Sequence, residues 1–214
     1  MERPDAGLIM ANIRIKSQWF RSGATRTPQQ TAGAMAFIVW KVAQNMLKQM
    51  RSAHFDIDVG PQYFAFTREV LVFFIHVLDR MVYERMSADG RAEFITALVR
   101  RVAEVLQDNE DTLLGMPAAG QPSHHDGFID LFNELASHYA KFGYGPKGPD
   151  FAFVRYLGHR IEGLMPEKDR HWVVDQVMAI EVPEAVQMLQ RAIQDVLSTE
   201  PRAPRATRAA TTGD

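Results

Sequence analysis

The fold is decided by the stretch Phe64-Ala-Phe-Thr-Arg-Glu-Val-Leu-Val-Phe-Phe-Ile-His-Val-Leu-Asp-Arg80. Between Val70 and Leu78 only His76 is polar. A helix that is apolar on every side is buried inside a fold, so we expect a central helix over about residues 61–86. Gly60-Pro61 is a typical helix start, because proline suits the first helical position. The few ionisable groups on a buried helix need partners or serve a function.

The segments around this central helix have the pattern of amphipathic helices. Thr27-Pro28 begins one of them, and Gln30 completes a capping box with Thr27. Apolar residues then recur at spacings of three and four. Helices are expected at about 28–51, 88–107, 125–141, 150–164, 167–180 and 183–197. Glycines and prolines mark two loops, a long one at 109–123 with a possible hinge and a shorter one at 142–149.

These patterns predict an all-α, single-domain bundle of about six or seven helices. The chain has 214 residues, of which 46% are hydrophobic, enough for one sizeable core. We expect an N-terminal docking arm over residues 1–26, where Trp19 and Phe20 precede the first helix, and a bundle domain over 27–199. Residues 200–214 contain no large apolar side chain, so we expect a disordered tail.

Composition narrows the classes of function. The formal net charge is −2, from 24 basic and 26 acidic side chains, so no strong field favours nucleic acid or membrane lipid as a partner. The chain has no cysteine, which removes disulfides and thiolate chemistry and favours a reducing compartment. No uncharged run reaches the roughly 20 residues that a membrane span needs. The apolar run near the N-terminus is too short for a signal peptide, so we expect a cytoplasmic protein.

A polar stripe on the central helix supplies the ligand-binding candidates. On a helical wheel Glu69, His76, Arg80 and Tyr83 fall within about 60° of one another, with Asp79 beside them. The stripe can line an internal site in which His76 binds a ligand or carries a proton. The alternative is structural: the charged residues form ion pairs with neighbouring helices, and His76 donates one hydrogen bond. We favour the structural interpretation.

Two further helices carry residues at metal-ligand spacing. Asp130, Glu134 and His138 follow one another at intervals of four, which places them about one turn apart. His159 and Glu162 form an i, i+3 pair. Solvated polar faces and weak side-chain contacts explain both patterns more simply. Neither H-E-x-x-H nor the E-x-x-H of di-iron bundles occurs in the sequence.

We therefore expect a cytoplasmic, non-enzymatic helical protein that acts by protein–protein contact or self-association, for example as a homodimer, without a cofactor. A small-ligand or metal-binding protein, with catalysis left open, is the alternative, and its cofactor would be a divalent metal or haem. In that case Glu69, His76 and Asp79 would face residues such as Glu134 or His159 across the bundle interior.

Overall fold

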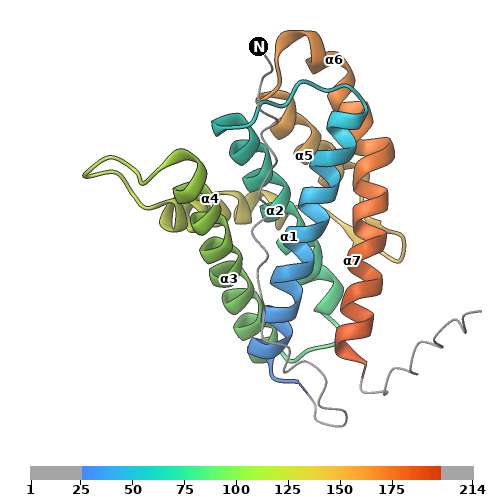
Figure 1. The fold of residues 1–214 in the computed structure, drawn as a ribbon. Helices are drawn as coiled ribbons and strands as arrows, with labels where there is room; N and C mark the ends of the chain where they lie inside the picture. The colour runs from blue at the N-terminus through green and yellow to red at the C-terminus, as the bar shows by residue number, and fades with distance from the viewer. Residues whose placement is uncertain (1–25, 199–214) are drawn as a thin grey trace, which may run out of the picture. The chain divides into compact units, whose positions relative to one another are not determined.

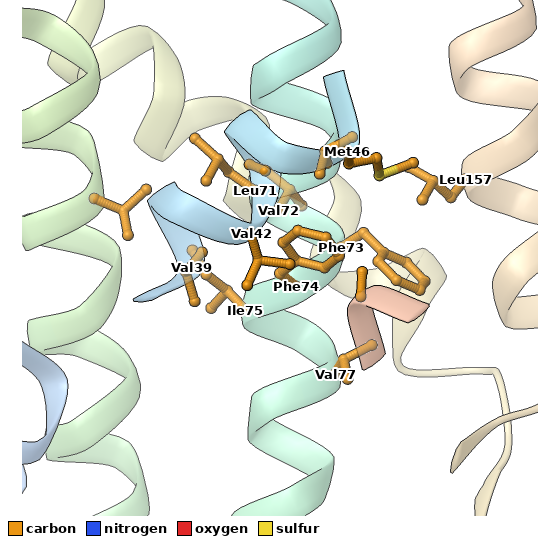
Figure 2. Packing of buried hydrophobic residues seen from close by; sticks show 14 of the residues in the cluster. Val39, Val42, Met46, Leu71, Val72, Phe73, Phe74, Ile75, Val77 and Leu157 are labelled. Atoms are coloured by element: carbon orange, nitrogen blue, oxygen red, sulfur yellow. The ribbon is translucent and has the colours of Figure 1, made fainter. Parts of the chain in front are cut away.

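The most buried element of the computed structural model is α2, which spans Pro61–Val82. The structure describes residues 26–198, so all but the last residue of the expected arm, and the whole expected tail, lie outside the described residues. Every residue from Val70 to Ile75 is fully buried. Figure 2 shows buried side chains of α1, α2 and α5 gathered around the middle turns of α2.

The other helices confirm the predicted all-α class. They are α1 (Pro28–Ser52), α3 (Ala88–Leu114), α4 (His124–Tyr139), α5 (Phe151–Glu162), α6 (Glu167–Gln176), a π-helical turn (Val177–Glu181) and α7 (Val182–Leu197). The strands β1 (Tyr144–Gly145) and β2 (Gly148–Pro149) pair as a short antiparallel hairpin that the sequence analysis did not predict. None of the helices between residues 26 and 198 is long and apolar enough to cross a membrane.

The packing explains why α2 is apolar on every side. α2 contacts α1, α3, α4, α5 and α7. α1 packs against α3 on one side and α7 on the other, while α5 packs against α6 (Figure 1). Helices with a single neighbour need one apolar face, whereas a helix with five neighbours has no face left for polar residues without partners.

Side-chain caps start the helices where the sequence predicts a start. The Thr27 hydroxyl accepts from the Gln30 amide nitrogen at 3.2 Å, and the Gln30 side chain accepts from the Thr27 amide nitrogen at 3.0 Å. This confirms the predicted capping box. The Ser87 and Ser123 hydroxyls accept from the amide nitrogens of Gly90 and Asp126 and so cap α3 and α4. These caps satisfy amide donors that a helix N-terminus leaves without partners.

Three boundaries differ from the sequence analysis. α2 ends at Val82, before the expected end of the central helix near residue 86. α3 continues to Leu114, so the loop before α4 is shorter than the expected segment 109–123. The expected break near residue 181 is a π-helical turn that joins α6 to α7. Pro183 follows this turn and has no amide hydrogen to donate to a backbone carbonyl. The hydrogen-bond pattern therefore changes locally to that of a π-helix, and the chain stays helical through residue 181.

Replacing Phe73 by alanine tests the central position of α2. Phe73 is fully buried, and its ring lies 5.3 Å from that of Phe153 and 6.1 Å from that of Tyr139. The cavity left by Phe73→Ala should lower the free energy of unfolding by about 3–5 kcal/mol, measured by urea denaturation. Phe151→Ala, at a position that is 67% exposed, is the matched control and should cost less than about 1 kcal/mol. Equal losses in the two variants would contradict this account of the core.

Candidate functional site

The charged residues of the predicted α2 stripe do not converge on one site. The Glu69 carboxylate accepts two hydrogen bonds from Arg160 of α5, of which the Nε bond is 3.0 Å long. The Glu69 side chain is only 7% exposed, and this contact raises the pKa of Arg160. Asp79 instead pairs with Arg91 of α3 at 3.6 Å, and burial raises the pKa of the Asp79 carboxyl. The stripe is divided among several helices.

His76 lies in a packed aromatic layer. Its ring stacks on Phe132 at 4.7 Å and on Tyr139 at 4.8 Å between ring centroids. Burial, together with the nearby charge of Arg80, lowers the pKa of His76 from 6.5 to about 4. Its Nε2 atom is buried and has no hydrogen-bond partner among the described residues, which differs from the hydrogen bond expected in the structural interpretation. Rings pack directly on its two faces, and Glu134 is exposed, so His76 and Glu134 share no cavity.

Arg80 and Tyr83 lie near the C-terminal end of α2, where the helix approaches the protein surface. Arg80 Nη2 donates to the carbonyl oxygens of Ala140 at 3.1 Å and Tyr139 at 3.4 Å. A cation at these C-terminal carbonyls of α4 is favourable for the helix dipole. Tyr83 is 61% exposed, and the Arg91 guanidinium lies 4.6 Å from the centre of its ring. Of the five stripe residues, these two line a pocket at the protein surface.

The residues proposed as metal ligands on α4 are exposed and separate. Asp130, Glu134 and His138 face solvent, and the His138 ring stacks on Tyr156 at 5.5 Å. Within residues 26–198, no group of three His, Asp or Glu side chains is placed to hold a metal ion. The arrangement of the described residues thus gives no support to the metal interpretation, and the spacing of four reflects a solvated helix face.

His159 and Glu162 form a side-chain contact in which both histidine nitrogens are occupied. His159 Nδ1 lies 2.9 Å from Glu162 Oε2, and Arg155 Nε donates to His159 Nε2 at 3.1 Å. A guanidinium can only donate, so Nε2 accepts and Nδ1 carries the proton that bonds Glu162. A metal at Nε2 would have to displace the Arg155 cation. The i, i+3 pair is therefore a helix-surface contact, as the simpler interpretation holds.

An ionic network around one buried carboxylate, which the sequence analysis missed, joins α2, α3 and α4. Arg68 of α2 donates to the Glu110 carboxylate of α3 through Nε at 2.9 Å and Nη2 at 2.6 Å. The Glu110 side chain is 1% exposed. His124, the first residue of α4, has its Nδ1 2.9 Å from Asp111 Oδ1 and 3.7 Å from Glu110 Oε2. We call Arg68, Glu110, Asp111 and His124 the corner network.

The sequence does contain a signal for Glu110. Buried residues of α3 recur every four positions at Phe94, Leu98, Val102 and Leu106, and Glu110 is the next member of this series. A carboxylate on the buried face of a helix requires a partner. The signal was lost because the predicted helix ended at residue 107, before Glu110.

The end of α3 and the loop after it expose adjacent large apolar side chains. Leu113, Leu114 and Met116 are 61%, 40% and 83% exposed, and we call these three residues the corner tip. Gly115 ends α3 with a φ of +84°, a conformation that favours glycine. The loop that follows projects from the bundle (Figure 1). Single exposed apolar residues are ordinary, whereas neighbouring ones mark contact surfaces.

Comparison with known proteins gives no match: no protein-family model, no curated protein and no solved structure matches this chain.

The packing of His76 predicts an acid-sensitive stability. Between about pH 6.5 and 4 the unfolded chain protonates His76 while the folded chain does not, so stability falls as the pH drops through this window. The lost contribution is at most about 3 kcal/mol. His76→Phe keeps the ring stacking and should flatten this part of the stability profile, measured by urea denaturation at several pH values. The control His171→Gln, on the exposed surface of α6, should keep the wild-type slope.

The corner network predicts a large loss of folding stability when one of its ion-pair partners is removed. Arg68→Met leaves the buried Glu110 carboxylate without its bidentate partner and should destabilise the protein by about 3 kcal/mol. The exposed Arg101–Glu104 pair provides a control, because Arg101→Met should cost less than about 1 kcal/mol. Chemical denaturation of both variants measures the difference. A loss for Arg68→Met no larger than that for Arg101→Met would show that the network carries little energy.

Proposed function

We propose that the protein acts by self-association, with the corner tip of one copy packed against a second copy. The observation that carries this proposal is the exposure of Leu113 and Leu114 at the end of α3 and of Met116 in the loop that follows. Removing such side chains from water favours association by about 1.5–3 kcal/mol for each one fully buried. We propose a binding role without catalysis or a cofactor, in the cytoplasm, where the lack of cysteine fits a reducing environment.

The corner network supports this proposal by holding the tip in place before binding. Arg68 and Glu110 tie the end of α3 to α2, and His124 ties the start of α4 to Asp111. Both ends of the loop between α3 and α4 are thus attached to the bundle. A surface that is ordered before binding loses less conformational entropy when the partner arrives. Buried ion pairs add little net stability, so their value here lies in the position they impose.

The charge of the chain supports a second copy as the partner. A net charge of −2 spread over 50 charged side chains leaves little electrostatic repulsion between copies. A two-fold contact uses the same patch on both subunits, so an apolar tip can pack near its own symmetry mate. Each substitution in such a contact is present twice.

Sedimentation equilibrium over a range of protein concentrations tests the proposal. We expect the wild-type chain to form a dimer and Met116→Asp to weaken it at least about a hundredfold, because two buried methionines are replaced. Trp172→Asp is the control, since Trp172 is 69% exposed on α6, away from the tip. Circular dichroism checks that both variants are folded. A monomeric wild-type chain at every concentration, or equal dissociation by Trp172→Asp, would contradict self-association through the corner tip.

A further inference from the structure

A pocket of about 600 Å³ lies where the end of α2, the β1–β2 hairpin and α7 meet. It is lined by Arg80 and Arg85 from the α2 end, by the hairpin segment 142–146, and by Gln190 and Gln194 of α7. We call it the hairpin pocket. Its volume falls in the range of about 300–1,000 Å³ that is common for small-molecule sites. It shares no element with the corner tip, so its function is independent of the proposed self-association.

Two guanidinium groups at this pocket have unused donors. Arg80 is held in place because its Nη2 atom donates to the carbonyls at the end of α4. No described residue accepts a hydrogen bond from Arg80 Nε or Nη1, and none forms an ion pair with Arg85. Glu84 is the single carboxylate among the described residues of the lining, so two cations there accompany one anion. The pocket therefore carries a local excess of positive charge.

Neutral polar groups also line the pocket. Gln190 and Gln194 lie one turn apart on α7 and present amide groups to the pocket. Tyr144 of the hairpin is half-buried, and burial raises the pKa of its hydroxyl, so this group stays protonated. A hydrogen bond with the Gln190 side chain and the charge of Arg85 act in the opposite direction on the same pKa. Amides and a hydroxyl supply directional hydrogen bonds for the neutral part of a ligand.

The hairpin wall of the pocket is formed without a ligand. Asp150 accepts from the amide nitrogens of Gly143 at 2.8 Å and Phe153 at 2.7 Å, so one carboxylate holds the hairpin and caps α5. A Cβ atom at position 143 would lie 2.7 Å from Asp150 Oδ2, so a larger residue there would displace this carboxylate. A pocket with a fixed wall binds without paying the entropy of ordering a loop.

We infer that the hairpin pocket binds a small organic anion, with its carboxylate or phosphate group between Arg80 and Arg85. Guanidinium groups match the oxygen geometry of both anions and form charge-assisted hydrogen bonds with them. Gln190, Gln194 and Tyr144 bind the neutral polar groups of the same molecule. Glu84 weakens the binding of a highly charged anion, so the site favours molecules with few negative charges.

Nuclear magnetic resonance of the isotopically labelled full chain tests this site, with inorganic phosphate and succinate as probes at constant ionic strength. Saturable shifts of the Gln190 and Gln194 side-chain amides are expected with one or both anions. Arg85→Gln should weaken the binding roughly tenfold, the effect of one charge-assisted hydrogen bond. Arg100→Gln, an exposed substitution on α3, should leave the binding unchanged. Glu84→Gln should tighten it, because the variant removes a repelling carboxylate.

The outcomes distinguish binding at a specific site from a general effect of charge on the spectrum. Saturation by phosphate alone assigns a phosphate ester, saturation by succinate alone assigns a carboxylate, and either result supports the pocket. Linear shifts without saturation up to about 50 mM of both anions would overturn the inference, since even weak specific sites saturate below this. An equal loss of binding in Arg100→Gln and Arg85→Gln would also overturn it. Arg85 has no ion-pair partner among the described residues, so the variant should keep its fold.

Discussion

The removal of α2 from water on every side is the constraint on which the rest of the structure depends. A helix with five helical neighbours gains much hydrophobic free energy, but each charge that it carries must find a partner inside the protein. Arg68 meets Glu110, Glu69 meets Arg160, and Asp79 meets Arg91. These pairs connect α2 to α3 and α5. The charged residues thereby define which helix lies beside which turn of α2.

The two surfaces proposed for binding lie where side chains are no longer enclosed by the neighbouring helices. Near its C-terminal end α2 reaches solvent, and Arg80 needs only part of its guanidinium to satisfy the carbonyls of α4. At the α3–α4 corner, the buried Glu110 fixes a loop whose side chains face outward. His76 lies between these two regions, half-buried and stacked on two aromatic rings, and it contributes packing and a pH dependence of stability.

The fold was largely predictable because helix periodicity and caps are local properties of the chain. Thr27 and Gln30 form the predicted capping box, and the apolar run around Val70 is buried. The site was far less predictable. Glu134 and His138 share a helix face at ligand spacing, yet their face is exposed. Glu110 carries a buried charge, yet it lay beyond the predicted end of its helix. The spacing of residues along one helix predicts which of them share a face, but it does not predict what that face packs against.

The sequence by itself determined the all-α class, the caps, and the concentration of apolar residues in one helix, because these depend on neighbours within one or two turns. Only the tertiary structure decided that Glu69 belongs to Arg160, that His76 is stacked between Phe132 and Tyr139, and that Arg80 reaches the hairpin pocket. The residues joined by these contacts lie far apart in the chain, and Glu69 and Arg160 are separated by 91 positions. Their energies depend on how whole helices pack and exclude water, which no local pattern encodes.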